Sequence, residues 1–312
     1  MKKIIILKHS RGELANQLWN YVSIYSYGLE IGIGTKVRNP SFFEYHHYFN
    51  FLTHENFFTR FLSFWFRNSA GRRNDLRNRL WRNIYFIYAK VIKTLIRFST
   101  EKILLSSENN NSQAIYLPPT SLVNLLENKE TGYFVGWLFR NPVGINKFKN
   151  ELTQSFSPNE KIKNKVDEII KPLRLKYHKI VGIHIRQSDY KEFKGGIYFI
   201  DQKRIKEIIE EYIKQNTIDR NQILFIITSD GKIEKEIFDD LNIYISKENA
   251  VTDLFILSKT DTIIGSDSSF GAFASWYGNI PHIIMTNHPV DWIYYIDKKE
   301  YFENKYSKMV QY

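Results

Sequence analysis

The sequence predicts an α/β protein whose C-terminal part forms a doubly wound parallel sheet. Beyond Tyr177, short apolar segments of strand length alternate with segments whose apolar residues recur at helical spacing. Strands and helices in this alternation form a parallel sheet with helices on both faces. The chain has 312 residues, of which 43% are hydrophobic and 25% charged. This composition excludes disordered and collagen-like classes, and the length fits two domains.

The N-terminal part begins with a strand and a helix. Residues 3–8 are an apolar run of strand length, too short for the core of a signal peptide. Residues 14–30 carry apolar side chains at intervals of three and four, which predicts a helix. No apolar run is long enough to span a bilayer. A second amphipathic helix is predicted from Leu76, with apolar positions at Leu76, Leu80, Ile84, Ile87, Val91 and Leu95.

The positive charge of the chain is concentrated around this second helix. The formal net charge is +11, and residues 60–102 hold eleven Lys and Arg against only Asp75 and Glu101. Twelve aromatic residues lie in 42–66. Two interpretations remain open. Either residues 60–102 lie against an anionic membrane surface, or an ordinary helical insertion, about 40–115, packs on the body with its arginines in water. A nucleic-acid partner is disfavoured, because no nucleic-acid-binding module accompanies the charge.

The C-terminal part is predicted as a regular alternation of strands and helices. A helix opens at residues 157–160, a capping box with Pro at the first helical position, and ends near Pro172. The two domains are therefore placed at 1–175 and 176–312. The strands and helices of the second domain are predicted at 179–185, 201–215, 223–228, 232–239, 243–245, 252–258, 262–264, 270–277 and 282–285.

Polar residues follow two of these strands, at the edge where a doubly wound sheet binds its ligands. The first segment is GIHIRQSDY, residues 182–190. Alternation along the strand places His184 and Arg186 on one face. There Arg186 can bind a diphosphate through two hydrogen bonds, and Asp189 can orient a base, a ribose or the arginine.

The second segment is IGSDSSFGA, residues 264–272, where a strand runs into a hydroxyl-rich turn and then a helix. The first N–H groups of that helix suit an anion, although Ser268 or Ser269 equally suits the plain role of helix cap. A third segment, RGELANQL, joins the first strand to the first helix at residues 11–18. It offers a flexible Gly12, the amides of Asn16 and Gln17 and the carboxylate of Glu13, with a helix cap as the alternative.

Several motifs are absent. The chain has no D-x-D pair, no Walker A or G-x-G-x-x-G loop and no clustered metal-ligand set. It also has no Cys, which excludes disulfides and thiolate nucleophiles and suits a reducing compartment. A bound diphosphate would therefore have to be held by arginine and backbone dipoles in place of a metal ion.

In this order the three segments resemble the alpha-1,2-fucosyltransferases of glycosyltransferase family 11, which belong with the alpha-1,6- and protein O-fucosyltransferases. GELANQ at 12–17 corresponds to the family's G-G-L-G-N-Q. HIRQSDY at 184–190 corresponds to H-x-R-R-x-D-Y, and SDSSFGA at 266–272 to S-x-S-S-F-S-W-W-A. The likeness covers residues 1–32 and 130–290 and leaves the aromatic and basic region outside it.

The resemblance implies a GT-B architecture of two Rossmann-like domains, with an acceptor-side domain first and the donor site in the C-terminal domain. It further implies inverting transfer of L-fucose from GDP-L-fucose, without cofactor or metal, to a glycan hydroxyl such as galactose O2. Arg186 would hold the pyrophosphate, aided by His184 and Asn16. The residues implied in donor binding are Asn16, Gln17, His184, Arg186, Asp230, Ser266, Asp267, Ser268 and Ser269, and those implied in catalysis are Glu13, Arg186 and Asp189.

The chain departs from the family pattern at two positions. Gln187 replaces the second Arg, which removes a charge near the donor. Another sugar nucleotide, or a non-catalytic nucleotide- or glycan-binding protein, therefore remains an alternative. Glu13 replaces a glycine and adds a carboxylate, which we prefer over Asp189 as the general base. We expect a cytoplasmic protein, peripheral on the inner face of the cytoplasmic membrane, that acts on a surface or lipid-linked glycan.

Overall fold

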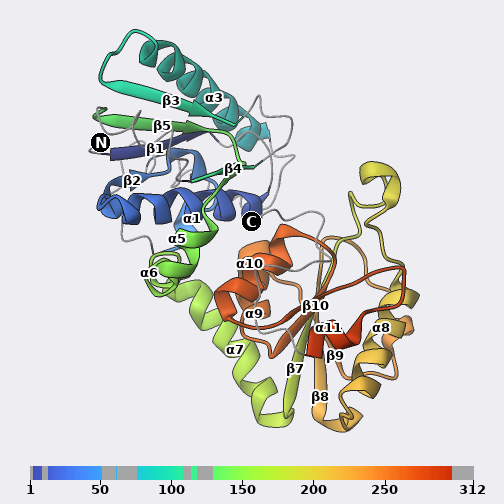
Figure 1. Cartoon of the computed structure of the whole chain (residues 1–312). Helices are drawn as coiled ribbons and strands as arrows, with labels where there is room; N and C mark the ends of the chain where they lie inside the picture. The colour runs from blue at the N-terminus through green and yellow to red at the C-terminus, as the bar shows by residue number, and fades with distance from the viewer. Residues whose placement is uncertain are drawn as a thin grey trace. The chain divides into compact units, whose positions relative to one another are not determined.

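The computed structural model describes residues 3–8, 13–50, 61, 76–107, 114–117 and 129–296. The chain divides into two compact units, of which the N-terminal unit ends at Asn159 and the C-terminal unit begins at Glu160. Each unit contains its own parallel sheet (Figure 1). The division falls before the helix 160–176, whereas the sequence places the domain boundary near the end of that helix.

The described helices and strands fall into two groups, one in each unit. In the N-terminal unit they are β1 (Lys3–Lys8), α1 (Leu14–Glu30), β2 (Val37–Arg38), α3 (Leu76–Ile96), β3 (Lys102–Ser106), β4 (Ile115–Tyr116), β5 (Thr131–Val135), β6 (Phe139–Arg140), α5 (Pro142–Lys147) and α6 (Lys149–Ser155). In the C-terminal unit they are α7 (Glu160–Lys176), β7 (Lys179–Ile185), α8 (Gln202–Gln215), β8 (Ile223–Ser229), β9 (Ile243–Ile245), α9 (Ala250–Leu257), β10 (Thr262–Gly265), α10 (Ser269–Gly278), β11 (His282–Ile284) and α11 (Trp292–Ile296).

The N-terminal sheet has the strand order β2-β1-β5-β3, with every pair parallel. The predicted first strand and first helix are confirmed at their predicted bounds. Helix α1 is buried on nearly all sides, which fits its largely apolar and aromatic composition. Several of its buried polar groups form hydrogen bonds within the unit. For example, the Asn20 side-chain oxygen accepts a hydrogen bond from the backbone N–H of Phe139 at 3.3 Å.

Helix α3 packs on this sheet with a different face from the predicted apolar stripe. Its buried side chains are Tyr85, Ala89 and Ile96, which contact Leu7 and Val135 of the sheet. The predicted apolar positions are largely exposed to solvent, at 58% for Leu80, 37% for Ile84, 65% for Ile87, 51% for Val91 and 56% for Leu95. The helix thus has two apolar faces. The sequence pattern predicts the burial of one face, whereas the sheet contacts the other.

The physical reason lies in the residue types. Tyr85 and Ala89 bury well beside a sheet, but they score lower than Leu or Ile in a spacing analysis. Strand β3, which follows the helix, pairs in parallel with β5. The described part of the aromatic and basic segment is therefore built into the N-terminal sheet layer, and it is not an appendage outside it. Six of the twelve aromatic residues in 42–66, those within 51–60 and 62–66, lie outside the described residues.

The C-terminal sheet has the order β11-β10-β7-β8-β9, again with every pair parallel. The chain starts at the central strand β7, builds outward to β9, and returns through α9 to β10 on the other side. This is a doubly wound sheet, as predicted, and its topological switch point lies between β7 and β10. Side chains of β7 such as Val181 and Ile183 pack with α8, whereas Gly182 lets α9 approach closely, because an added Cβ would lie 2.6 Å from Leu257.

Two predicted elements of the C-terminal unit differ from the structure. Helix α7 continues through Pro172 to Lys176, and Pro172 lies on its exposed side. The helix predicted at 232–239 is only a 3₁₀ turn at Lys235–Phe238. The other predicted strands and helices agree with the structure to within two residues at either end.

Candidate functional site

Polar side chains of the C-terminal unit gather at the carboxyl ends of β7, β8 and β10. The strands are in register there, with His184 of β7 opposite Thr228 of β8 and Gly265 of β10. Arg186 follows β7, Asp230 follows β8, and residues 266–269 follow β10. The structure therefore brings together eight of the predicted residues: His184, Arg186, Asp189, Asp230, Ser266, Asp267, Ser268 and Ser269.

Arg186 lies between two carboxylates. One terminal nitrogen of its guanidinium is 2.6 and 2.7 Å from the two oxygens of Asp189, and its Nε is 3.2 Å from Asp230. The guanidinium also lies over the ring of Tyr190, 5.1 Å from the centroid. Burial alone would lower the pKa of Arg186, but Asp230 and Asp189 raise it. The side chain is still 21% exposed, so a permanently charged group is presented at the switch point.

Asp230 fixes the segment that carries Arg186. Its carboxylate accepts hydrogen bonds from the backbone N–H groups of Gln187 at 2.7 Å and Ser188 at 3.2 Å, and from the Ser188 hydroxyl at 2.7 Å. Burial opposes ionisation of Asp230, yet these hydrogen bonds and Arg186 lower its pKa. The end of β8 is thereby tied to the loop after β7 by an ionised carboxylate.

Gln187, which occupies the position of the family's second Arg, is buried. Only 7% of it is exposed, and its side-chain amide donates to the carbonyl of Ile200 at 3.2 Å. Its Cβ also packs closely on Gly231. The Gln187 side chain therefore stabilises the loop before α8. The positive charge at the switch point is that of Arg186.

His184 lies beneath the site and is 5% exposed. Its Nε2 is 3.1 Å from the Ser268 hydroxyl, its Nδ1 is 3.4 Å from the Thr228 hydroxyl, and its ring stacks on Phe270 at 4.8 Å. Burial, followed by the charges of Arg186 and His282, lowers the pKa of His184 to about 3. The imidazole is therefore neutral at physiological pH, and it contacts Ser268 at the start of α10.

Residues 266–269 connect β10 to α10. The Ser266 hydroxyl accepts a hydrogen bond from the backbone N–H of Arg186 at 3.0 Å, and the Asp267 carbonyl accepts one from the Tyr190 hydroxyl at 2.9 Å. Ser268 is the N-cap of α10, since its hydroxyl accepts from the N–H of Phe270 at 3.3 Å. Ser269, the first residue of the helix, is partly exposed. A charged arginine and a capped helix N-terminus therefore belong to one rigid framework at the switch point.

The predicted residues of the N-terminal unit are Glu13, Asn16 and Gln17. Glu13 stands at the N-cap position of α1, but its side chain makes no capping hydrogen bond. Instead its Oε2 accepts a hydrogen bond from the Tyr45 hydroxyl at 3.3 Å. Asn16 is partly buried and Gln17 is 5% exposed. Gly12 of the same motif lies outside the described residues.

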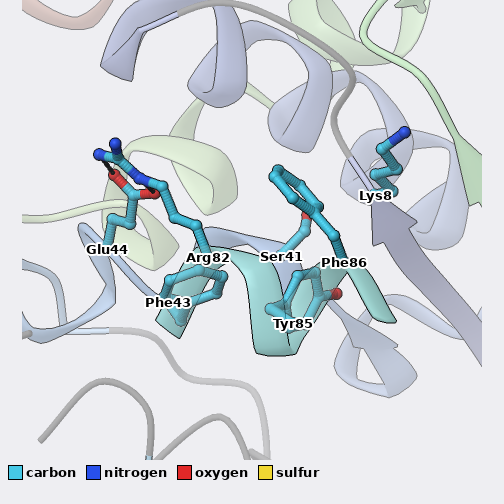
Figure 2. A pocket seen from close by; sticks show the side chains of 7 residues that line it. All are labelled: Lys8, Ser41, Phe43, Glu44, Arg82, Tyr85 and Phe86. Carbon is cyan, nitrogen blue, oxygen red and sulfur yellow. Dashed lines mark hydrogen bonds and ion pairs between the residues drawn. The ribbon is translucent and has the colours of Figure 1, made fainter. Parts of the chain in front are cut away.

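A small pocket, with room for about one water molecule, lies in the N-terminal unit at the end of β1 (Figure 2). Its lining consists of Lys8, Ser41, Phe43, Glu44, Arg82, Tyr85 and Phe86. Arg82 binds Glu44 through two hydrogen bonds of 2.6 and 2.7 Å. The hydrogen bond to Glu44 raises the pKa of Arg82, and the charges of Tyr45 and Glu13 add to this effect. The pocket and Glu13 thus share one electrostatic environment.

Sequence reasoning missed the residues around this pocket and one carboxyl in the C-terminal unit. Asp253 of α9 is 9% exposed, and burial raises its pKa to about 7 although the Ser246 hydroxyl donates to it at 2.5 Å. Glu44 meets Arg82 and Tyr45 meets Glu13 from distant parts of the chain, so no local spacing marks these residues. Among the described residues, no group of three His, Cys, Asp or Glu side chains could hold a metal ion.

No protein-family model and no curated protein matches the chain. Its α/β fold, with a four-stranded and a five-stranded parallel sheet, matches the GT-B fold of solved fucosyltransferases. A mutant of Arabidopsis thaliana FUT1 in complex with GDP aligns with a TM-score of 0.52 at 12% identity, over 93% of this chain and 71% of that one.

Two further structures align over nearly their whole length. Fucosyltransferase NodZ from Bradyrhizobium has a TM-score of 0.51 at 12% identity, over 92% of this chain and 97% of that one. POFUT1 in complex with GDP has a TM-score of 0.50 at 11% identity, over 91% of this chain and 99% of that one. In another POFUT1–GDP structure the matched part is 51% of this chain and 57% of that one. The predicted GT-B fold is therefore confirmed.

Proposed function

We propose that the chain is an inverting glycosyltransferase of the alpha-1,2-fucosyltransferase type, which moves L-fucose from GDP-L-fucose to a glycan hydroxyl without a metal ion. The observation that carries the proposal is Arg186, held at the switch point beside the N-terminus of α10. The fold supports it, because NodZ alpha-1,6-fucosyltransferase soaked with GDP-fucose aligns over 92% of this chain with a TM-score of 0.50.

In this proposal the C-terminal unit binds the donor. The pyrophosphate takes the place of Asp189 on Arg186, and the N–H groups and hydroxyls at the start of α10 bind its remaining oxygens. His184 acts through Ser268, because it is buried and already contacts that hydroxyl. Asp230 is assigned to positioning of the 186–188 segment, since its oxygens are engaged there. Asp267 is assigned to binding the nucleoside part of the donor.

The N-terminal unit is assigned the acceptor and the base, and Asn16 and Gln17 keep the donor-binding role that the resemblance implies. The acceptor oxygen forms a bond to C1 of fucose while the bond from C1 to the diphosphate breaks, and the acceptor proton passes to Glu13. Arg186 stabilises the charge on the departing GDP. Glu13 is preferred to Asp189 as the base, because it belongs to the unit that is assigned the acceptor, where its carboxylate accepts a hydrogen bond from the Tyr45 hydroxyl.

We propose galactose O2 of a surface or lipid-linked glycan as the acceptor hydroxyl. The surface beside the end of β1 supports a sugar ligand, because it combines the polar Arg82–Glu44 pair with the exposed aromatic ring of Phe86. Sugar hydroxyls suit the charged pair, and the apolar face of a pyranose suits an aromatic ring. We place the protein in the cytoplasm, peripheral on the inner face of the cytoplasmic membrane.

The buried position of Gln187 bears on the alternatives. Because its side chain is turned into the loop before α8, the missing arginine charge leaves the Arg186 framework intact. Two alternatives are therefore tested by experiment: the chain uses a different sugar nucleotide, or it binds a nucleotide without catalysis.

That experiment is calorimetric titration of the purified chain with GDP and UDP, followed by a transfer assay with labelled GDP-fucose and a glycan panel. Tight GDP binding with transfer supports the proposal, while preference for UDP assigns another donor. GDP binding without transfer to any glycan favours a non-catalytic relative. Arg174→Ala is the matched control, because Arg174 forms an Arg–Asp pair with Asp261 at 2.6 Å in the same unit, away from the switch point.

A further inference from the structure

Helix α3 carries a continuous row of exposed apolar side chains. They are exposed at 58% for Leu80, 37% for Ile84, 65% for Ile87, 51% for Val91, 56% for Leu95 and 85% for Phe98. Their spacing of three and four residues places them on one side of the helix. Phe98 continues the row past the last turn, because its N–H donates to the carbonyl of Leu95 at 3.2 Å. We call these six residues the α3 stripe.

The α3 stripe is not a displaced part of the core. The sheet-facing side of the same helix is filled by Tyr85, Ala89 and Ile96, and Tyr85 is anchored by a hydrogen bond from its hydroxyl to the carbonyl of Leu7 at 2.5 Å. Rotating the helix to bury the stripe would break this bond and expose the packed face. The exposed row therefore belongs to the folded state, and contiguous apolar patches of this kind mark interaction surfaces.

The charge of the helix identifies the partner. Helix α3 contains no Asp or Glu. Arg79, Lys90 and Arg97 are exposed, and by helical spacing they lie on the side of the stripe away from the sheet. Arg82 is excluded from this set, because it is paired with Glu44. An apolar row flanked by unopposed cations on one side is the pattern of a helix that lies in the interface of an anionic membrane.

A second copy of the chain suits the stripe less well. Two α3 helices packed stripe to stripe would bring the cations of both copies close together with no acidic residue on either helix to offset them. An anionic lipid surface instead offers the apolar contact and the opposite charge at the same place.

We propose that α3 lies flat in the interface of an anionic bilayer. The stripe is buried at the level of the headgroups and upper acyl chains, and Arg79, Lys90 and Arg97 reach the lipid phosphates. None of the helices that the structure describes is long and apolar enough to cross a membrane. This sharpens the proposed location by naming the contact face, and it does not depend on the transfer reaction.

The test is sedimentation of the full-length chain with lipid vesicles, once with neutral phosphatidylcholine and once with added phosphatidylglycerol. The wild type should bind the anionic vesicles, and added salt should weaken the binding. The double variant Ile87→Glu, Val91→Glu should lose about tenfold or more in apparent affinity, because it places charge in the apolar contact. The double variant Lys90→Glu, Arg97→Glu should lose more affinity for the anionic vesicles than for the neutral ones.

The matched control is the double variant Leu175→Glu, Ile293→Glu, whose positions are 91% and 78% exposed in the C-terminal unit. It should bind vesicles like the wild type. All variants should keep their circular dichroism and unfolding temperature, because every changed side chain is exposed. A wild type that ignores anionic vesicles, or a stripe variant that binds like the wild type, overturns the proposal.

A wild-type dimer in sedimentation equilibrium that Ile87→Glu, Val91→Glu converts to monomers would assign the stripe to a second copy, and would also overturn the lipid proposal. GDP binding and transfer to a soluble acceptor are measured without vesicles. If GDP binding and transfer fail, the proposed transferase function is wrong and the membrane proposal is unaffected. If vesicle binding fails, the membrane proposal is wrong and the transferase function is unaffected.

Discussion

Arg82 in the N-terminal unit and Arg186 in the C-terminal unit each form a short ion pair with a carboxylate, at nearly the same distances. Each makes contacts of 2.6 and 2.7 Å with one carboxylate, Glu44 for Arg82 and Asp189 for Arg186. The two arginine side chains are also similarly exposed, at 24% and 21%. The difference lies in the partners, because Glu44 is 16% exposed and Asp189 is 55% exposed.

This difference decides which arginine can bind an anion. Glu44 is largely shielded from water and lies 38 residues from Arg82 in sequence, so removing it would leave a partly buried charge unpaired. Asp189 is three residues from Arg186 and reaches water, so an incoming phosphate can replace it at little cost. The exposure of the carboxylate partner thus distinguishes Arg186, which can bind a ligand, from Arg82, which forms a structural ion pair. The exposures of the two arginines themselves do not distinguish them.

The largest expected effect comes from Arg186→Ala. We expect kcat/KM for transfer from GDP-fucose to fall about 10³-fold and GDP affinity to fall with it, because the charge and its two-bond geometry are both lost. Arg82→Ala should instead leave GDP affinity within about twofold and lower the unfolding temperature, since the partly buried Glu44 then loses its partner. Titration calorimetry and thermal unfolding measure the two effects. Equal losses of GDP affinity in both variants would remove the distinction between the arginines.

Glu13→Gln should produce the next largest effect. The amide keeps the shape of the side chain but cannot accept a proton, so kcat should fall about 10²-fold, within the range of a lost general base. GDP affinity should stay unchanged, because Glu13 contacts Tyr45 and has no assigned role at the diphosphate. Tyr45→Phe is the companion variant and should lower kcat only a few-fold. Normal turnover in Glu13→Gln would transfer the role of base to Asp189.

Much of the C-terminal unit was predictable because its strands and helices have unambiguous periods. The buried run 179–185 and its partner at 223–229 have the length and composition of central parallel strands. Since side chains alternate along a strand, the positions of His184 and Arg186 relative to one another follow from the sequence as well. The topology then places both at the switch point.

The parts that sequence could not supply depend on contacts between distant residues. Glu13 meets Tyr45 over 32 residues and Arg82 meets Glu44 over 38, and neither pairing has a local spacing. The face of α3 that meets the sheet is chosen by shape, with Tyr85 and Ala89 preferred to Ile87 and Val91. The burial that raises the pKa of Asp253 likewise arises only once α9 has packed on the sheet.

Asp253 and Glu44 differ in the partner of their carboxyl groups. The partner of Asp253 is the Ser246 hydroxyl, whereas the partner of Glu44 is an arginine. Burial raises the pKa of Asp253 from 3.8 to about 7, so the folded state holds this proton between about pH 4 and 7 and the unfolded state does not. Its contribution to stability therefore falls as the pH rises through that window. Asp253→Asn should be about 4 kcal/mol more stable than the wild type at pH 8, and equally stable near pH 4.

The measurement is chemical unfolding of both proteins across this pH range. Only the difference between the two is informative, because the lowered pKa values of His184 and His282, about 3 and about 4, give a slope of opposite sign. A difference that does not change with pH would mean that Asp253 is ionised in the folded protein.

The smallest effect separates the two carboxylates that hold Arg186. Asp189→Asn removes the exposed competitor, so GDP affinity should rise about two- to fivefold, with unfolding unchanged because surface pairs contribute little. Asp230→Asn should act in the opposite direction. The Asp230 carboxylate accepts two backbone N–H groups and the Ser188 hydroxyl, so its loss loosens the segment that carries Arg186 and lowers both stability and GDP affinity. Calorimetry on the two variants gives the signs directly. If Asp189→Asn weakens GDP binding as Asp230→Asn does, Asp189 positions the arginine in the complex as well, and the displaceable partner inferred from its exposure does not exist.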